Sequence, residues 1–403
     1  MATPTSLVGI ELELDIGPVA HGGHCVARHL GRVVFVRHAI PGERVRARVT
    51  EGHDDSRFLR ADAVTVLRRS ADRVEPPCPY SGPGRCGGCD FQHVSLPRQR
   101  LLLADVVREQ LERLAGVSWP VEVEPVPGDT GGLRWRTRVG FVAAPSGQPG
   151  LHKHRSHDII AVDDCRIGSA SLPDVTPALA AGAKEALAVI SSTGESVVVT
   201  DRATAPVITE AAAGRSWQVH AGDFWQVHPG AADALVAAVV EGVRPAAGER
   251  CWDLYAGAGM FAGVLAERVG GDGAVIAVES HRRTARSAAH NLAEMPQVRV
   301  VAEPVDRFVR SRIAQGRLDV VVLDPPRAGA GAAVVRGIVA RSPRVIAYVA
   351  CDPAALARDL ATLKTFGYEL VSLRAFDLFP MTAHLECVAI CKQPSDGCLN
   401  QGR

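Results

Sequence analysis

Residues 251–261 read Cys-Trp-Asp-Leu-Tyr-Ala-Gly-Ala-Gly-Met-Phe, and this stretch decides how the C-terminal part of the chain folds. The short run from Cys251 to Tyr255, mostly large apolar side chains, predicts a buried strand. Gly257 and Gly259 permit a turn into a helix and allow a ligand to approach the backbone closely. The stretch therefore predicts a strand–turn–helix unit with a binding site at the turn.

The same alternation of strand and helix extends to residue 393. An apolar helix is expected at 231–242, and further strands are expected at 274–278, 298–301, 318–323, 345–349, 369–376 and 385–391. Helical patterns separate the first six strands. This order predicts a doubly wound, Rossmann-like α/β sheet, which binds ligands at the carboxyl ends of its strands. We expect one domain over 226–393 and a disordered tail over 394–403.

Residues 1–70 show a different pattern, in which turns separate short strands. Polar and apolar residues alternate at 11–16, 43–49 and 58–67, which predicts strands. Strands at this spacing favour a small antiparallel OB-like barrel, a fold that often binds single-stranded RNA. A β-domain without a ligand is the alternative.

Residues 71–225 are expected to form a mixed central domain. Helical patterns lie at 98–115 and near 175–190, among several β-like runs. Residues 134–138 read Arg-Trp-Arg-Thr-Arg. Aromatic and guanidinium groups in alternation are suited to base stacking and phosphate contacts on RNA. An exposed strand edge made soluble by Arg is the alternative.

The composition excludes several classes of protein. The chain has 403 residues, of which 47% are hydrophobic and 22% charged, and 45 basic residues balance 44 acidic ones. These values are ordinary for a globular protein of two or three domains. No apolar run is long enough for a membrane span, and the N-terminus lacks the basic start and apolar core of a secretory signal. We expect a cytoplasmic monomer with no membrane partner.

Glu279 is the candidate contact for a ribose. It ends the second strand of the sheet, 22 residues after Gly257, where a carboxylate can accept both ribose hydroxyls. The glycine spacing does not match G-x-G-x-x-G, which disfavours a dinucleotide. A ligand that has a ribose but no pyrophosphate, S-adenosylmethionine (SAM), fits better. A turn and a capping acid of any α/β protein are the alternative.

Asp324 ends the fourth strand and begins the sequence Asp-Pro-Pro-Arg-Ala-Gly. A carboxylate at a strand end is expected to point into the cleft, and the two prolines stiffen the loop beside it. Arg327 stands where an amine methyltransferase would carry an aromatic residue. This difference disfavours amine methylation.

A thiol and a carboxylate are expected at the same edge of the sheet. Cys351 follows the fifth strand, and the helix that begins near Pro353 is expected to lower the pKa of the thiol. A thiolate that adds to C6 of a pyrimidine makes C5 nucleophilic, and a base must afterwards remove the C5 proton. Glu386, at the start of the seventh strand, is the candidate base. A structural thiol and a solvated carboxylate are the alternatives.

Four cysteines form a candidate metal centre. Three are close together and one is remote, in the order Cys78, Cys86, Cys89 and Cys165. Four thiolates suit a [4Fe–4S] cluster or tetrahedral zinc. Zinc sites usually show two close pairs, so this spacing favours the cluster. Unligated thiols in a loop are the alternative, and a disulfide framework is disfavoured in a cytoplasmic protein.

Together these motifs resemble the RNA 5-methyluridine (uracil-C5) methyltransferase family, in the branch that has a TRAM domain and an iron–sulfur cluster. The resemblance covers nearly the whole chain. It rests on the four cysteines and on residues 224–228 (Phe-Trp-Gln-Val-His), 253–261, 324–329, 348–353 and 379–386.

The resemblance implies SAM-dependent methylation of uracil C5 in RNA, with Cys351 as the nucleophile and Glu386 as the base. It also implies a TRAM domain at 1–70 that binds RNA, and a [4Fe–4S] cluster held by the four cysteines. Ribosomal RNA, of the 23S type, is favoured over transfer RNA. The residues that it implies around SAM and the target uracil are Gln226, Tyr255, Glu279 and Asp324.

The chain departs from the family pattern at three positions. Met260 and Asp352 stand where Asn is common in relatives, and Pro326 stands where some members have Ala. Three rival functions are a cytosine-5 methyltransferase, a non-catalytic cluster-bearing RNA-binding protein and a nicotinamide-dependent oxidoreductase. The first would normally have its nucleophile in a Pro-Cys pair, and the last would need the missing dinucleotide fingerprint.

Overall fold

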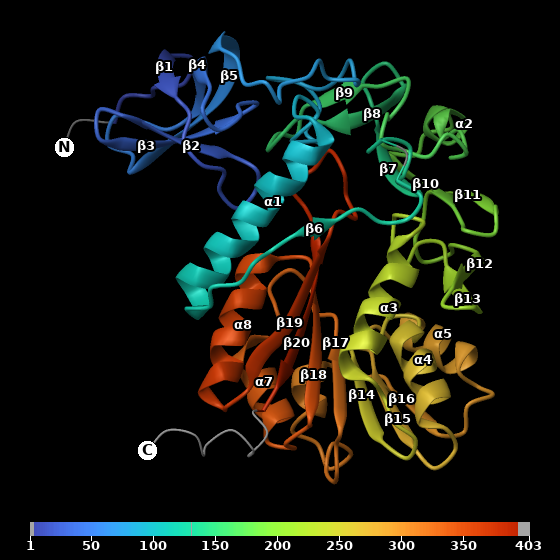
Figure 1. The fold of residues 1–403 in the computed structure, drawn as a ribbon. Coiled ribbons are helices and arrows are strands. Elements are labelled where there is room, and N and C mark those ends of the chain that lie inside the picture. Colours follow the sequence, from blue (N-terminus) through green and yellow to red (C-terminus); the bar gives the residue numbers. More distant parts are fainter. Residues whose placement is uncertain (1–3, 130, 394–403) are drawn as a thin grey trace, which may run out of the picture.

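A computed structural model describes residues 4–129 and 131–393 of the chain. Figure 1 shows an N-terminal sheet, a central region of short strands, and a large C-terminal sheet covered by helices. The expected tail at 394–403 lies outside the described residues. In the described ranges, no helix is long and apolar enough to cross a membrane.

The N-terminal sheet has five strands in the order β1-β4-β5-β3-β2. Its core comes from alternating small and β-branched residues such as Val34, Val36 and Ala47, which are buried on one face. The expected strands are present, with two more that the pattern did not reveal. One pair, β3–β5, is parallel, so the prediction of an entirely antiparallel barrel was wrong. The strands are β1 (Glu11–Asp15), β2 (Cys25–His29), β3 (Arg32–Arg37), β4 (Arg44–Glu51) and β5 (Phe58–Arg68).

The C-terminal sheet has the order β16-β15-β14-β17-β18-β20-β19-β6. Neighbouring strands from β16 to β18 are parallel, and β20 runs antiparallel to β18 and β19. The strands are β14 (Arg250–Leu254), β15 (Ala274–Val278), β16 (Val298–Val301), β17 (Val320–Leu323), β18 (Val345–Ala350), β19 (Glu369–Phe376) and β20 (Glu386–Lys392), with β6 (Val123–Glu124) at the edge.

Helices cover both faces of this sheet, which confirms the doubly wound fold (Figure 1). One face packs against α3 (Ala231–Val243), α4 (Met260–Val269) and α5 (Arg282–Asn291). The other packs against α6 (Val305–Phe308), α7 (Gly331–Val339), α8 (Pro353–Thr365) and α1 (Leu96–Gln110), which the π-helical turn Leu111–Ala115 continues. Strands covered on both faces need apolar residues at every position, and all six residues of β18 are buried.

The central region is a second five-stranded sheet with a separate two-stranded hairpin. The predicted helix near 175–190 was wrong beyond its first turn, because Gly182 (φ +99°) ends it and residues 185–190 pair with both neighbouring strands. The elements are β7 (Arg138–Ala143), β8 (Pro149–His152), β9 (Ile159–Ala161), α2 (Thr176–Ala180), β10 (Glu185–Ile190), β11 (Ser196–Val199), β12 (Val207–Ala212) and β13 (Arg215–His220).

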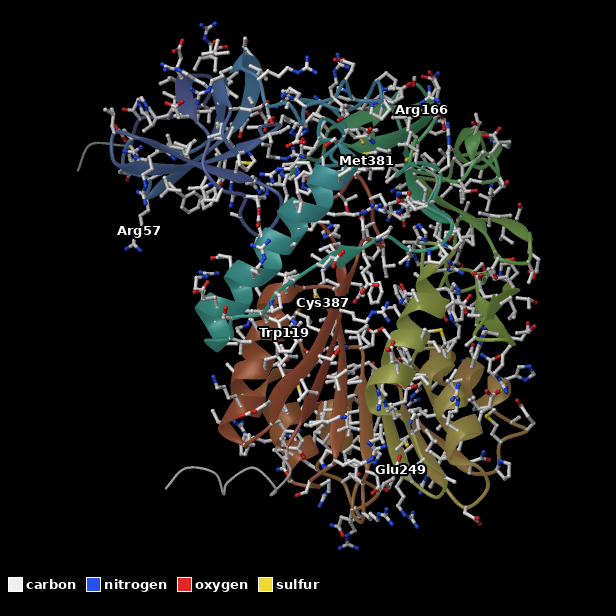
Figure 2. All side chains as sticks on the ribbon, viewed as in Figure 1. Arg57, Trp119, Arg166, Glu249, Met381 and Cys387 are labelled. Atoms are coloured by element: carbon white, nitrogen blue, oxygen red, sulfur yellow. The ribbon has the colours of Figure 1, made fainter. Side chains whose placement is uncertain are left out.

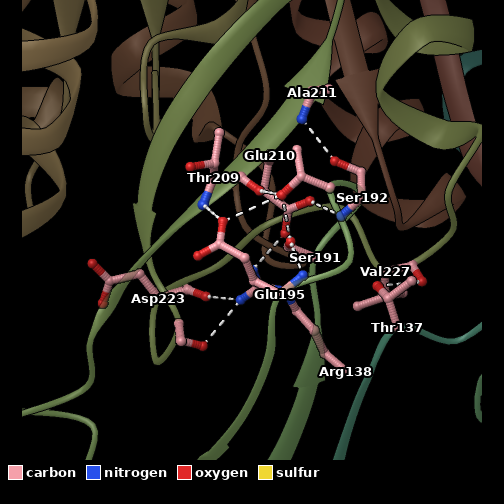
Figure 3. Close-up of polar contacts among 12 residues, drawn as sticks. Thr137, Arg138, Ser191, Ser192, Glu195, Thr209, Glu210, Ala211, Asp223 and Val227 are labelled. Carbon is pink, nitrogen blue, oxygen red and sulfur yellow. Dashed lines mark hydrogen bonds and ion pairs between the residues drawn. The ribbon is translucent and has the colours of Figure 1, made fainter. Parts of the chain in front are cut away.

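A buried ion pair joins the central sheet to this hairpin and to the segment before α3 (Figure 3). Arg138 on β7 donates to Glu210 on β12 and to the carbonyl oxygens of Ala221 and Asp223. Glu210 also accepts from the backbone N–H of Ser192. Because the guanidinium and the carboxylate are both buried, this network fixes how the three segments meet.

The packing of residues 134–138 contradicts the interpretation that Trp135 stacks on RNA bases. The side chain of Trp135 is 1% exposed and packs with Ile167 and Met381, so no base can stack on it. Arg134 is paired with Asp164, and Arg138 is buried in the network described above. The alternation of aromatic and basic residues therefore reflects packing between segments.

Candidate active site

The glycine turn after β14 meets the end of β15 at the carboxyl edge of the sheet. The backbone N–H of Gly257 donates to Glu279 Oε2 at 3.1 Å, and Glu279 Oε1 accepts from the N–H of His281. Gly257 has φ +54°, and a Cβ there would meet nothing within 4 Å. The turn is therefore open on the side that a ligand would use, as the sequence predicts.

Two further residues of β14 and its turn are held in costly states. Tyr255 is half-buried and has φ +65°, a backbone conformation that residues other than glycine rarely adopt. Asp253 is fully buried; its Oδ2 accepts from the N–H of Ala262, and its Oδ1 has no hydrogen-bond partner. Burial raises the pKa of Asp253 to about 7. Sequence reasoning did not single out Asp253, although an acid inside an apolar strand was the available signal.

The strand pairing brings Cys351 and Glu386 together. In the antiparallel pair β18–β20 the register ends with Ala350 facing Cys387, and Cys351 and Glu386 are the residues next to this pair, just after β18 and at the start of β20. The charge of Glu386 accordingly acts on the Cys351 thiol and raises its pKa. Two residues that lie 35 positions apart in the sequence therefore share one site.

Asp324 completes this group from the neighbouring strand. Its backbone N–H donates to the carbonyl oxygen of Leu254 at 3.2 Å, which fixes Asp324 at the end of β17, the strand between β14 and β18. Burial raises the pKa of Asp324 to about 7. Burial and the charge of Asp324 raise the pKa of Glu386 well above its ordinary value, and Glu386 Oε1 has no hydrogen-bond partner.

The expected low pKa of the Cys351 thiol was wrong. Burial, followed by the charges of Glu386 and Asp324, raises it to about 11. These effects outweigh the positive end of α8, because two acids lie beside the sulfur and little water reaches it. Arg327 opposes them and lowers the pKa of both the thiol and Glu386. Sequence reasoning assigned no such role to Arg327.

Gln226 lies half-buried in the segment between β13 and α3. Thr137 donates twice to the carbonyl oxygen of Val227 (Figure 3). Arg283 of α5 is paired with Asp223. The segment that carries Gln226 is therefore held by contacts with the central region and with α5. Among the described residues, no hydrogen bond joins the Gln226 side chain to the other predicted cofactor residues.

The loop that leads into Glu386 is held by residues far away in the sequence. The carbonyl oxygen of Met381 accepts from the N–H groups of Asp90 and Phe91, and its N–H donates to Gln99 on α1. Asp90 Oδ2 also accepts from the N–H of Ala383 at 3.0 Å. Figure 2 places Met381 beside the start of α1, above Cys387 in the sheet. Sequence reasoning missed these supports, since no local pattern marks them.

The four predicted ligand cysteines surround one small cavity of about 30 Å³. Burial raises the pKa of the thiols of Cys86, Cys89 and Cys165. Gly88 N–H and Gln92 Nε2 donate to the sulfurs of Cys86 and Cys89 at 3.4 and 3.3 Å. Among the described residues, no group of three or more His, Cys, Asp or Glu is arranged to hold a metal ion.

Comparison with known proteins identifies the family. A model of the tRNA (uracil-5-)-methyltransferases matches residues 224–393, and a TRAM domain model matches residues 5–64. An RNA methyltransferase of Streptomyces coelicolor is 46% identical over 98% of this chain and 96% of its own length. The chain belongs to the tRNA (uracil-5-)-methyltransferase family. This chain is also 32% identical to the 23S rRNA (uracil(1939)-C(5))-methyltransferase RlmD of Pseudomonas putida, over 96% of this chain and 95% of RlmD.

A solved structure shares the fold of this uracil-C5 RNA methyltransferase. It is the Pyrococcus abyssi tRNA (uracil-54, C5)-methyltransferase in complex with S-adenosyl-L-homocysteine. The two superpose with a TM-score of 0.70 at 22% sequence identity, over 94% of this chain and 99% of that chain. The comparison confirms the predicted SAM-dependent methyltransferase fold.

The electrostatics of the site make a prediction for the reactivity of Cys351. Below a pKa of about 11, each unit of pH raises the thiolate fraction about tenfold, so alkylation by iodoacetamide should accelerate through pH 9 and 10. Glu386→Gln removes a neighbour that is negative once it has ionised, and should accelerate alkylation at pH 10. Arg327→Ala removes a positive neighbour and should slow it. The rate is measured on the Cys351 peptide by mass spectrometry.

Arg327→Lys is the matched control, because it keeps the positive charge and should leave the rate close to that of the unmodified protein. Equal rates in Glu386→Gln and the unmodified protein would contradict the placement of the carboxylate beside the sulfur.

Proposed function

We propose that the protein methylates C5 of a uridine in ribosomal RNA through a covalent bond between Cys351 and C6 of the uracil. The observation that carries the proposal is that Cys351, just after β18, and Glu386, at the start of β20, lie next to the last register pair of these strands, at the edge where the glycine turn also lies. Uracil C5 is a weak nucleophile, so the reaction requires a thiolate and a base within reach of one ring. Few arrangements of side chains provide both.

The steps assign one task to each group. The Cys351 thiolate adds to C6, and the electron pair of the C5=C6 bond moves toward C5 and the C4 carbonyl. C5 then takes the methyl group that SAM supplies when bound. Glu386 removes the remaining C5 proton, the C5=C6 double bond forms again, and the thiolate leaves. Arg327 favours the ionised forms of both Cys351 and Glu386, which the cycle uses in turn.

The residues of the glycine turn fit SAM. Glu279 would accept the ribose hydroxyls, and the backbone at Gly257 leaves room for the ligand. Asp253 Oδ1 and the Asp324 carboxylate are further acceptors at this edge. We assign Gln226 and Tyr255 to the same pocket, on the side of the target uracil. Met260 is buried against the core at the start of α4, beside the glycine turn. Because relatives commonly have Asn at this position, the chain lacks a polar side chain there.

The RNA substrate is inferred from the relatives. RlmD of Pseudomonas putida is named for uracil 1939 of 23S rRNA and matches nearly the whole chain, which favours ribosomal RNA. The family model and the Pyrococcus abyssi enzyme are named for tRNA, so tRNA is the second candidate. A TRAM domain at 1–70 and a central domain at 71–225 would hold the RNA beside the catalytic domain at 226–393. The cytoplasmic location and the monomeric state of the protein stay predictions.

A [4Fe–4S] cluster bound by Cys78, Cys86, Cys89 and Cys165 is the second part of the proposal. The four side chains line one cavity, and two of the sulfurs accept hydrogen bonds of the kind that stabilise thiolates. Buried thiols with a raised pKa are costly to ionise unless a metal binds them. Cys165 is distant in the sequence from the other three cysteines, so the cluster would tie the segment after β9 to residues 78–89.

Release of tritium from RNA that contains [5-³H]uridine tests the proposed reaction. Each methylation should release one tritium in the presence of SAM. Cys351→Ala should lower the rate on the order of 10⁴-fold or more, because it removes the nucleophile. Cys25→Ala, which removes a thiol from the N-terminal core, should keep the rate. Tritium release by Cys351→Ala at the normal rate would exclude the mechanism, and comparison of rRNA with tRNA identifies the substrate.

The cluster is tested by metal analysis. Protein purified without oxygen should be brown and contain about four irons per chain. Cys89→Ala should lose the colour and the iron, whereas Cys391→Ala, a buried cysteine of β20, should keep both. A colourless protein that contains one zinc would overturn the assignment.

A further inference from the structure

A loop of the N-terminal domain reaches the nucleophile of the catalytic domain. We call residues 20–24, which precede β2, the His21 loop. His21 Nε2 lies 3.0 Å from Asp352 Oδ2, and Asp352 directly follows Cys351. This contact joins two residues that are more than 300 positions apart in the sequence.

Asp352 uses both of its carboxylate oxygens to fix the turn that carries Cys351. Oδ1 accepts from the N–H of Ala355 at 2.7 Å and caps the N-terminus of α8, while Oδ2 is bound by His21. The His21 hydrogen bond and the cap lower the pKa of Asp352 against the effect of burial, so the carboxylate is ionised and accepts both hydrogen bonds. The rotation of the Asp352 side chain is therefore set jointly by the start of α8 and by a residue of another domain.

The same loop touches the segment that carries Glu386. A Cβ at Gly23 (φ +79°) would lie 2.6 Å from the Cβ of Ala383, so the loop can approach this closely only with glycine. Ala383 lies three residues before Glu386 and donates to Asp90, which is paired in turn with Arg37 of β3. The turn that carries Cys351 and the loop that leads into Glu386 thus both contact the N-terminal domain or residues paired with it.

We propose that the N-terminal domain completes the catalytic centre, and that His21 is a positioning residue that sets the Cys351 turn relative to Glu386. The inference rests on the proposed role of Cys351 as nucleophile. It assigns the N-terminal domain a task in the chemical step, in addition to any contact with RNA. Both partners are partly exposed, at 43% and 19% of their side chains, and such pairs contribute little to overall stability. Loss of His21 should therefore affect the reaction and leave the folded state intact.

Substitutions of His21 separate positioning from RNA binding. His21→Ala should lower kcat about tenfold, because a small displacement of the nucleophile lowers the rate strongly. The KM for RNA, the affinity for RNA and the unfolding midpoint in urea should not change. His21→Gln keeps a donor that can reach Asp352 and should restore kcat to within about threefold. His29→Ala, on β2 of the same domain, is the matched control and should behave like the unmodified enzyme.

A double-mutant cycle tests whether His21 acts through Asp352. Asp352→Asn keeps an oxygen that can cap α8 but loses the charged acceptor for His21. The double variant should be no slower than the slower single variant, because both changes break the same contact. Effects that multiply would overturn the inference, as would an unchanged kcat in His21→Ala or a loss of RNA affinity that accounts for its whole defect.

Glycine substitutions test the approach of the loop without changing any charge. Gly31→Ala and Gly23→Ala place an alanine in the same left-handed conformation, at φ +79° in both cases, but only at Gly23 does the new Cβ meet Ala383. Gly23→Ala should therefore lower kcat at unchanged RNA affinity, while Gly31→Ala, outside the His21 loop, should not. Equal kcat values in the two variants would contradict the inference. Failure of the proposed function itself is distinguishable, since Cys351→Ala would then still methylate RNA.

Discussion

The site depends on one strand pairing, the antiparallel register between β18 and β20. A shift of this register by one residue would turn Glu386 to the other face of the sheet and separate it from Cys351. The pairing is protected because both strands are central and apolar, with their side chains buried between two layers of helices. The interaction that stabilises the fold therefore also brings the nucleophile and the base together.

The burial of three ionisable side chains at this edge of the sheet imposes a second constraint, because their negative charges oppose one another. Cys351, Glu386 and Asp324 lie close together with little water, and each raises the free energy of ionising the next. Arg327 is the cation that opposes this effect. A uracil that enters the site must leave its stack in the RNA, at a cost of a few kcal/mol, and it would displace the remaining water. The N-terminal and central regions offer separate surfaces whose contacts with RNA could offset that cost.

Much of the fold could be predicted from the sequence because its signals are local. Apolar runs separated by helical patterns marked the strands of the C-terminal sheet, and a glycine turn and a strand-end acid marked the cofactor edge. The failures share a cause, since they depend on partners far away in the chain. Trp135 is buried by packing that its own segment does not reveal, and residues 185–190 form a strand because two neighbours pair with them. The pKa of Cys351 was predicted in the wrong direction because the helix was visible in the sequence and the two neighbouring acids were not.

Asp352 shows how a departure from a family pattern can acquire a partner. It stands where the resembling family commonly has Asn, and the structure pairs it with His21 of another domain. Sequence motifs identified both halves of the site but could not supply this contact.

The most direct test of the central claim is to stop the reaction before the last proton is removed. Glu386→Gln, incubated with RNA and SAM, should accumulate a covalent RNA–protein complex, because addition and methyl transfer do not need the base. Tandem mass spectrometry should then find a methylated uridine attached to the Cys351 peptide. Release of free methylated RNA at the normal rate, or attachment of the uridine to any other residue, would contradict the account.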